Sequence, residues 1–421
     1  MSTPPGSLEE IVRIEGGRVL ATIIRLTGDI GLAEDAVQDA VLIAMERWPG
    51  DGVPRNPAAW LTTVARNKAL DRIRREASRQ DRERVAVDLE GGGDDEWHFS
   101  DSTIRDDQLR LLFTCCHPAL SADARVALAL RTIGGLRTHE IAAAFLVPEA
   151  TIGQRISRAK RKIAIARVPY RVPSDAEIPD RLAAVLAVVS VIFTAGHHAA
   201  SGRADARVDL ADEGVRLARL LVSLMPDEPE CEGFLALVLA THARRGARLG
   251  DRGELVLMAD QDRGRWDRAA IREAADAVER ALRRRRPGPF QIQGAIACLH
   301  GLADTYAETD WAQIAELYAF LEQQQPTAVV RVNRAVAVAE VSGAGPALAL
   351  LDAFPGGFDH VRHWHLYWSV RSDLLRRCGR IDDAVVALDA ALACEMNDSD
   401  RALLTARRAG LASGRFSFND A

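Results

Sequence analysis

The sequence predicts an all-α protein, and three observations support this class. Alanine, leucine and arginine are abundant in a chain of 421 residues that is 48% hydrophobic and 27% charged, which is a globular composition that favours helices. Apolar residues recur at helical spacing over most of the chain. Gly and Pro stand mostly between these periodic segments. A chain of this length is expected to hold roughly two to four domains.

Charge is segregated along the chain, although the net charge of −5 does not indicate nucleic acid by itself. Residues 135–171 hold eight Arg and Lys residues against two acids, Glu140 and Glu149. Residues 85–107 hold eight acids against one arginine, Arg105. Such separation indicates different surfaces with different partners.

The first predicted part, residues 8–84, is a helical bundle. Helical periodicity runs from Leu8 to about Trp48, with a turn at 28–31, and a Gly- and Pro-rich loop follows at 49–54. Asn56-Pro57 then opens a helix with a basic end, in which we expect Trp60 to belong to the core. One earlier helix carries an apolar stripe of Ala33, Val37, Ala40 and Ala44. Its other face is polar and acidic, and such faces are usually only solvated; the residues are Glu34, Asp35, Gln38 and Asp39.

The second predicted part, residues 85–107, is an acidic flexible linker, because it has little to bury and repels itself. The third, residues 108–168, contains a helix-turn-helix pattern. Thr138 can cap the first helix of this motif, and Pro148 starts the second. The second helix should bury a stripe at i, i+4 and i+7 spacing, formed by Ile152, Ile156, Ala159 and Ile163.

The opposite face of that second helix is suited to DNA. Gln and Arg can hydrogen-bond to the edges of adenine and guanine in the major groove. The candidates for base contact are Thr151, Gln154, Arg155, Arg158 and Lys162. Three further residues are better placed for phosphates, namely Arg137, Lys160 and Arg161. An ordinary helical hairpin with a solvated basic face is the alternative.

The last predicted part, residues 173–421, is a helical-repeat domain. Segments 331–354 and 364–394 each look like a helix pair with a Gly-containing turn. Small residues at this spacing allow antiparallel helices to pack closely, as in tetratricopeptide repeats, although the period is irregular.

Three segments resemble extracytoplasmic function sigma factors, which form group IV of the sigma-70 family. Residues 106–162 resemble region 4, which recognises the −35 promoter element, with Leu146 in the turn where many members have Gly. Residues 32–41 resemble region 2.2 and residues 56–75 resemble regions 2.3 and 2.4. The whole chain resembles the subgroup with a tetratricopeptide-like C-terminal extension, more specifically in its first 170 residues than beyond.

This resemblance implies a sigma factor that directs promoter-specific initiation with core RNA polymerase. The acidic face at 34–39 would bind the β′ clamp helices, and region 4 would meet the β flap. The −10 element would be captured by loop 50–56 and by Arg66, Asn67, Lys68, Arg72, Arg74 and Arg75. The linker would either mimic RNA charge or act only as a tether.

The resemblance also implies that the extension controls activity, because the subgroup lacks a dedicated anti-sigma partner. The physical picture is an intramolecular contact of the C-terminal domain with region 2 or region 4. A helix-turn-helix activator with a helical-repeat sensor is the alternative, but such a protein would not need the N-terminal part.

The sequence offers no catalytic motif, no cofactor site and no convincing metal site. Neighbouring residues on a helix point about 100° apart, so Cys115-Cys116-His117 and His197-His198 chelate poorly. The loop 257–267 concentrates both charge signs beside Trp266 and either braces helices or lines a ligand groove; only the latter would suit an enzyme. Arginines at 280–286 and the polar residues Gln291, Asn333 and Arg334 suit either surface or structural roles.

A cytoplasmic protein is expected, with no membrane association. The N-terminus has no secretory pattern, and the six cysteines form no CxxC motif, which suggests reduced thiols. The longest apolar run, 182–195, has 14 residues and is shorter than a bilayer span.

Overall fold

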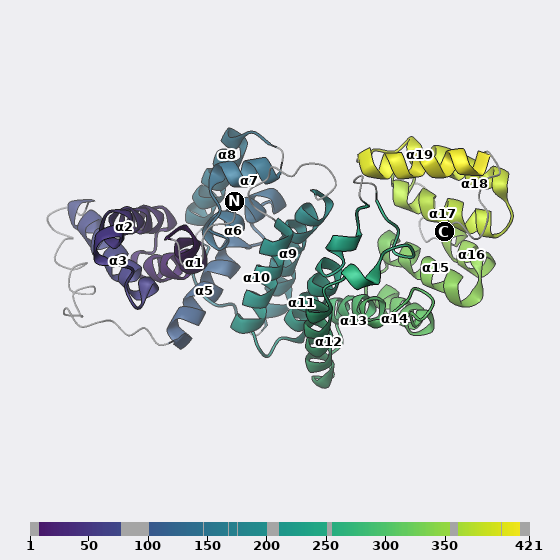
Figure 1. The fold of residues 1–421 in the computed structure, drawn as a ribbon. Coiled ribbons are helices and arrows are strands. Elements are labelled where there is room, and N and C mark those ends of the chain that lie inside the picture. Colours follow the sequence, from purple (N-terminus) through teal and green to yellow (C-terminus); the bar gives the residue numbers. More distant parts are fainter. Residues whose placement is uncertain are drawn as a thin grey trace. The chain divides into compact units, whose positions relative to one another are not determined.

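The computed structural model describes residues 8–76, 101–145, 147–166, 168–174, 176–199, 210–250, 255–353, 361–396 and 398–412 (Figure 1). Across these residues the regular elements are helices, with one isolated antiparallel bridge between Leu249 and Leu255. The predicted all-α class is therefore confirmed. The chain forms two compact units, Met1–Gly196 with Asp205–Leu220, and His197–Ala204 with Leu221–Ala421. The predicted part boundaries at 84, 107, 168 and 173 stay predictions.

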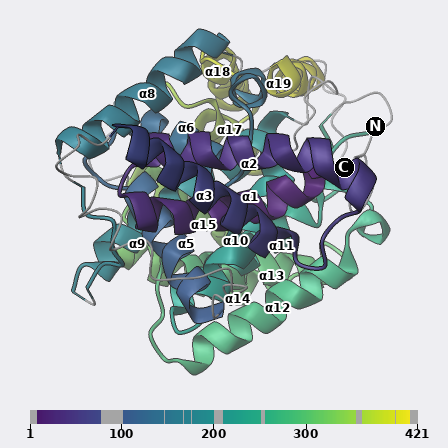
Figure 2. The same ribbon diagram turned by 90° about the vertical axis from the view of Figure 1, so that its left-hand side faces the viewer.

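The first three helices pack against one another as a bundle (Figure 2). They are α1 (Leu8–Thr27), α2 (Ile30–Asp51) and α3 (Pro57–Glu76). Asp29 caps α2, because its side chain accepts a hydrogen bond from the Leu32 N–H at 2.9 Å. The predicted stripe is largely buried, but Val37 is only half-buried and Ala36 is buried instead.

Helix α2 ends later than the sequence predicts. We expected a loop from Pro49, but the helix continues through Pro49 to Asp51. A proline this close to the C-terminus of a helix removes one N–H, while the rest of the helix is unaffected. The helix stops at Gly52, whose φ of 83° suits glycine and whose N–H donates to the Trp48 carbonyl at 3.0 Å.

Six more helices belong wholly or partly to the first unit. They are α5 (Asp101–Cys115), α6 (Ala122–Thr132), α7 (Thr138–Ala144), α8 (Glu149–Ile165), α9 (Ile178–Ala199) and α10 (Leu210–Leu224). Helix α5 begins inside the segment that the sequence assigns to the acidic linker. Residues 85–100 of that linker lie outside the described residues, so its proposed RNA mimicry stays a prediction.

Helix α9 is both long and apolar. Its segment Ile178–Gly196 is long and apolar enough to cross a membrane by length and composition alone, although the predicted apolar run was only 14 residues. A buried core helix of a soluble protein passes the same test. Several α9 side chains are buried within the protein, including Leu182, Val185, Leu186, Val189 and Ile192.

The second unit continues as successive packed helices. They are α11 (Pro229–His242), η1 (Arg245–Ala247), η2 (Arg263–Arg265), α12 (Arg268–Arg283), α13 (Pro289–Leu302), α14 (Trp311–Gln324), α15 (Ala328–Ser342), α16 (Ala344–Asp352), α17 (His365–Arg377), α18 (Ile381–Leu392) and α19 (Asp398–Ala412).

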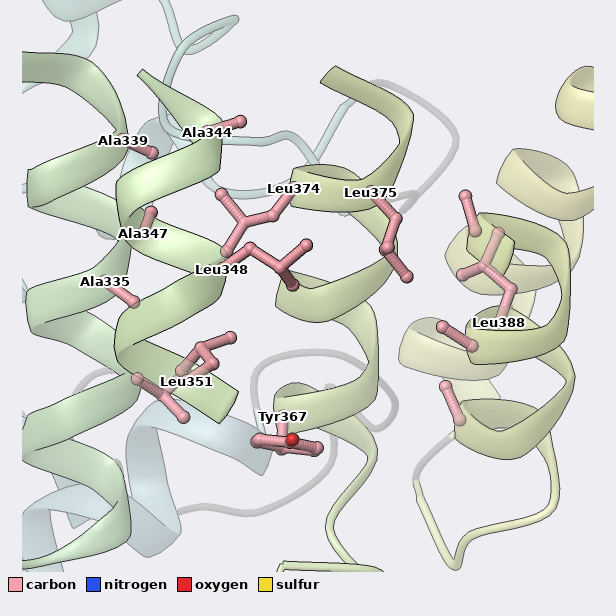
Figure 3. Close-up of a cluster of buried hydrophobic side chains, with 14 of the residues drawn as sticks. Ala335, Ala339, Ala344, Ala347, Leu348, Leu351, Tyr367, Leu374, Leu375 and Leu388 are labelled. Carbon is pink, nitrogen blue, oxygen red and sulfur yellow. The ribbon is translucent and has the colours of Figure 1, made fainter. Parts of the chain in front are cut away.

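The two predicted helix pairs are present in this unit. They correspond to α15 with α16 and to α17 with α18, and the members of each pair contact one another. Gly343 and Gly379 stand in the turns, with φ of 87° and 76°. L-residues with a side chain rarely adopt this backbone conformation, which explains glycine at both turns. The core between these helices combines small and large residues, including Ala335, Ala347, Leu348, Leu374 and Leu388 (Figure 3).

Candidate nucleic-acid interface

Helices α7 and α8 form the predicted helix-turn-helix. Pro148 is the N-cap residue of α8, as expected. The predicted inner stripe is confirmed without exception, because the buried residues of α8 are Ile152, Ile156, Ala159 and Ile163. This burial fixes which side of α8 faces outward. Leu146, where the resemblance departs from the family pattern, lies outside the described residues.

Most of the predicted DNA-contacting residues lie on the outer side of α8. Gln154, Arg158, Arg161 and Lys162 are exposed, and Thr151 is half-buried near the start of the helix. Arg137 is exposed just before α7, where its backbone N–H donates to the Glu140 carboxylate at 2.7 Å. The exposed side chains present positive charges on an accessible surface. They also present the Gln154 amide, which can both donate and accept hydrogen bonds.

Two residues of α8 that the sequence predicts to contact DNA form ion pairs within the first unit. Arg155 pairs with Asp123 of α6 at 2.9 Å. Lys160 pairs with Glu34 of α2, and the two side chains are only 25% and 15% exposed. The structure therefore joins a residue predicted to bind DNA to one predicted to bind polymerase.

The acidic face of α2 has a second internal partner in α3. Arg72 bridges two carboxylates, reaching Asp35 at 2.7 Å and Asp39 at 2.8 Å. Asp35 and Gln38 are exposed, whereas Asp39 is half-buried. The sequence assigned Arg72 to DNA and the two acids to polymerase, and the spacing gave no sign of this pairing.

The remaining basic residues of α3 extend along its second half. Asn67, Arg74 and Arg75 are exposed, while Arg66 and Lys68 are half-buried. Trp60 is half-buried rather than fully in the core. Its ring meets the buried Trp48 edge to face, with centroids 5.4 Å apart. The helix starts as predicted, because the Asn56 side chain accepts from the Ala59 N–H at 3.1 Å.

Sequence reasoning missed Asp107, which is fully buried. Its carboxylate accepts hydrogen bonds from Arg25 of α1 and Arg110 of α5, both at 2.9 Å. The Tyr170 hydroxyl donates to the Ala21 carbonyl at 2.8 Å, close to the Asp107 carbonyl at 3.2 Å. Burial and the Asp107 charge raise the pKa of Tyr170. One feature of the sequence could have indicated this role: Asp107 and Arg110 have the i, i+3 spacing of an ion pair on a helix, which does not suit a linker.

Helices α9 and α10 also contact the backbone around the helix-turn-helix. Arg181 donates to the Phe113 carbonyl at 2.8 Å. Arg216 donates to the Ile133 carbonyl at 3.1 Å and pairs with the buried Glu213 at 2.7 Å. Ile133 lies at the end of α6, directly before the turn that leads to α7. The Arg216 contact therefore reaches the backbone directly before the helix-turn-helix.

Cys115 and Cys116 are buried. The Cys115 sulfur lies 3.2 Å from the Thr132 hydroxyl, and burial raises the pKa of Cys115 to about 12. Among the described residues no group of three or more His, Cys, Asp or Glu side chains is arranged to hold a metal ion. The side chains of His197 and His198 lie outside the described residues.

The arginines at 280–286 and Gln291 have structural partners in the second unit. Arg280 pairs with Glu232 at 2.9 Å and Arg284 with Asp227 at 2.9 Å. Gln291 is fully buried, and its amide donates to Glu230 and to the Arg286 carbonyl. Of the other two polar candidates, Asn333 is exposed and Arg334 pairs with Glu322 at 2.6 Å.

Comparison with protein families agrees with this arrangement. Residues 11–79 match sigma-70 region 2, residues 110–163 match sigma-70 region 4, and residues 181–282 match a family of unknown function, DUF6596. None of these families indicates an enzyme. No solved structure matches the chain.

Several known proteins are similar in sequence. An uncharacterized protein of Rhizobium meliloti, R00370, is 42% identical over 394 residues, which cover 92% of each chain. The ECF RNA polymerase sigma factor SigL of Mycobacterium tuberculosis is 33% identical over 141 residues, covering 33% of this chain and 77% of SigL. The probable ECF RNA polymerase sigma factor SigI of the same species is 30% identical over 155 residues, covering 34% of this chain and 50% of SigI. The chain belongs to the extracytoplasmic function family of RNA polymerase sigma factors.

Proposed function

We propose that this sigma factor directs promoter-specific transcription initiation from the cytoplasm, with region 4 recognising the −35 element through α8. The observation that carries this proposal is the division of α8 into two faces. Its four-residue inner stripe is buried, and Gln154, Arg158, Arg161 and Lys162 are exposed on the remaining surface. A helix held in this way can enter the major groove with Gln and Arg side chains toward base edges.

Region 2 serves core polymerase and the −10 element in this proposal. The exposed Asp35 and Gln38 of α2 are available to the β′ clamp helices, while region 4 meets the β flap. Asn67, Arg74 and Arg75 of α3 are exposed toward solvent and suit phosphates of the opened strands. Loop 50–56 holds an unstacked base.

The ion pair between Lys160 and Glu34 has a consequence for this function. Each side chain is mostly covered while the pair is formed. Lys160 cannot neutralise a phosphate, and Glu34 cannot dock on polymerase, until the pair opens. Full engagement of polymerase and promoter therefore requires region 4 to move relative to region 2.

The C-terminal extension modulates activity through its contacts with region 4. Support comes from Arg181 and Arg216, which lie beyond residue 173 and donate to backbone carbonyls of α5 and of the α6 end. The Ile133 carbonyl lies at the end of α6, directly before the turn that leads to α7. A change in α9 or α10 would then alter the position of the DNA-reading helix.

The test compares promoters with intact and altered −35 elements in transcription by core polymerase and the full-length protein. Arg158→Ala should lower initiation at the intact promoter about tenfold to a hundredfold, as expected for the loss of roughly 1–3 kcal/mol of base contact. It should also reduce the discrimination between the two promoters. Arg283→Ala, at an exposed arginine of α12 that pairs with Glu279, is the matched control. Equal behaviour of the two variants would exclude region 4 recognition through Arg158.

A further inference from the structure

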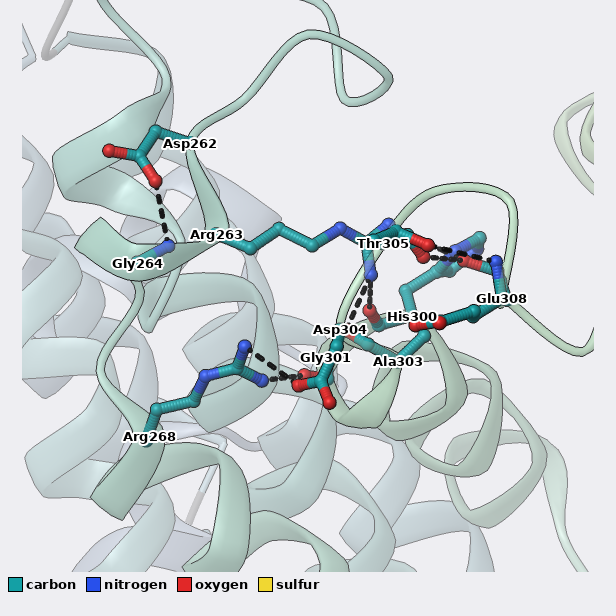
Figure 4. A network of polar contacts seen from close by, with 11 residues as sticks. Asp262, Arg263, Gly264, Arg268, His300, Gly301, Ala303, Asp304, Thr305 and Glu308 are labelled. Carbon is teal, nitrogen blue, oxygen red and sulfur yellow. Dashed lines mark hydrogen bonds and ion pairs between the residues drawn. The ribbon is translucent and has the colours of Figure 1, made fainter.

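The loop that contains Trp266 serves first as a brace between helices of the second unit. Arg263 is buried and donates to the carbonyls of His300 at 3.0 Å and Ala303 at 2.8 Å (Figure 4). These carbonyls lie at the C-terminal end of helix α13. Backbone carbonyls there lack hydrogen-bond partners within the helix, so a positive charge beside them is favourable. Arg268 adds a bond to the Gly301 carbonyl at 3.1 Å and an ion pair with Asp304. These contacts with the end of α13 therefore account for why Arg263 and Arg268 are in the loop.

The contacts described above do not involve Arg244, so this structural role does not account for it. Its guanidinium lies 5.9 Å from the centre of the Trp266 ring, and the Arg263 guanidinium lies 4.6 Å from the same ring. Two cations thus share one indole. In the part of the second unit that the structure describes, neither arginine forms an ion pair, and the acceptor that Arg244 finds is the Met258 sulfur at 3.3 Å.

Several hydrogen-bonding atoms around these arginines are buried without a partner. They include Arg244 Nε, Trp266 Nε1 and His300 Nδ1. Trp266 is only 3% exposed, so solvent does not satisfy its N–H. An unsatisfied buried donor costs about 1–3 kcal/mol, and proteins usually avoid it. A concentration of such donors beside an arginine without a carboxylate therefore indicates a missing acceptor.

The electrostatic environment of these residues indicates that the missing acceptor carries negative charge. Burial, together with the charges of Arg248 and Arg263, lowers the pKa of Arg244 to about 10. Burial and the charges of Arg244 and Arg263 lower the pKa of His300 to about 4. Burial is the larger cause of both shifts, and the neighbouring arginines add positive potential in the same direction. A bound anion would remove this repulsion and accept the unpaired N–H groups.

We propose that Arg244, Trp266 and His300 form a binding site for a small oxyanion, the phosphate or carboxylate group of a low-molecular-weight ligand. The guanidinium supplies charge-assisted hydrogen bonds, for which phosphate and carboxylate oxygens are matched acceptors. The indole N–H adds a directed donor, and Arg263 contributes charge while holding α13. This site goes beyond promoter recognition, and its test needs neither DNA nor polymerase.

The test uses the full-length protein with inorganic phosphate and, separately, acetate as probes, at constant ionic strength set with chloride. The indole N–H resonance of Trp266, assigned by its loss in Trp266→Phe, should shift saturably with at least one probe. Arg244→Gln should weaken that binding about tenfold or more. Arg265→Gln, an exposed arginine of the same 3-10 turn, should leave it unchanged.

Thermal unfolding gives a second readout of binding. Phosphate or acetate should raise the Tm of the wild type more than it raises the Tm of Trp266→Phe, which keeps the aromatic packing but lacks the N–H. Stronger binding of phosphate would assign the site to phosphoryl ligands, and stronger binding of acetate to carboxylates. The proposal is overturned if neither probe binds saturably to the wild type, or if Arg244→Gln and Trp266→Phe both bind as the wild type does.

Discussion

Lys160 of α8 forms an ion pair with Glu34 of α2, so the recognition helix of region 4 is joined to the acidic face of region 2. The residues are separated by 126 positions in the sequence. Each belongs to a surface proposed to bind a different partner. In the proposed function the pair links these two surfaces, and it would have to open for both partners to be bound.

The strength of this pair can be measured with a double-mutant cycle on Glu34→Gln and Lys160→Gln. Because both side chains are partly solvent-accessible, we expect a coupling energy of about 0.5–1 kcal/mol in urea unfolding. The coupling should fall with added salt. A cycle on Glu34 and the exposed Lys162 serves as control and should give no coupling. Equal values in the two cycles would contradict the contact.

Removal of Arg216 should destabilise the first unit. Arg216→Ala leaves the Glu213 carboxylate buried without its partner and frees the Ile133 carbonyl. The expected loss is about 2–4 kcal/mol, measured as a lower midpoint in thermal or urea unfolding. The double variant with Glu213→Gln should recover part of it. Lys162→Ala, at an exposed position of α8 in the same unit, should change stability by less than about 0.5 kcal/mol.

The stability of the second unit should depend on pH through His300. Its pKa is lowered to about 4 in the folded protein, below the ordinary value of 6.5, so between these values only the unfolded chain takes up the proton. Stability is thus unaffected above pH 6.5 and falls as the pH drops toward 4. Relative to His300→Gln, the wild type should lose roughly 2–3 kcal/mol over this range. Parallel pH profiles of the two proteins in urea unfolding would refute the assignment.

The turn between α15 and α16 should require glycine. Gly343→Ala forces a side chain into a backbone with φ of 87° and should cost about 1–2 kcal/mol in thermal unfolding. Gly345→Ala lies two residues later, within α16, and its new methyl group meets nothing within 4 Å. That substitution should be neutral or stabilising by a few tenths of a kcal/mol. A similar cost at both positions would show that the turn geometry is not the cause.

Local periodicity was sufficient to predict the helices and the orientation of the recognition helix. The spacing of Ile152, Ile156, Ala159 and Ile163 identified the buried side of α8, because that spacing is determined by the 3.6-residue helical repeat. Asn56-Pro57 gave the start of α3 for a similar local reason. The end of α2 was wrong by three residues, since a proline in the last turn does not by itself stop a helix.

The contacts between distant segments could not be predicted in this way. The sequence gives the charges of Glu34, Lys160 and Arg72 but not which of them meet in space. Asp107 was assigned to a linker because its neighbours are acidic, although burial beside Arg25 and Arg110 makes it structural. The cluster around Arg244 brings together the segment between α11 and η1, the residue after η2, and α13, and no spacing rule relates these segments.

The central claim is that this chain is a sigma factor that acts with core RNA polymerase at promoters. Core polymerase should be combined with the full-length protein on a promoter fragment, and specific run-off transcript should be measured against core polymerase alone. We expect promoter-specific transcript only when the protein is present, and about tenfold less or lower with Arg158→Ala. Transcription indistinguishable from that of core polymerase alone, at every promoter from the protein's own genome, would contradict the account.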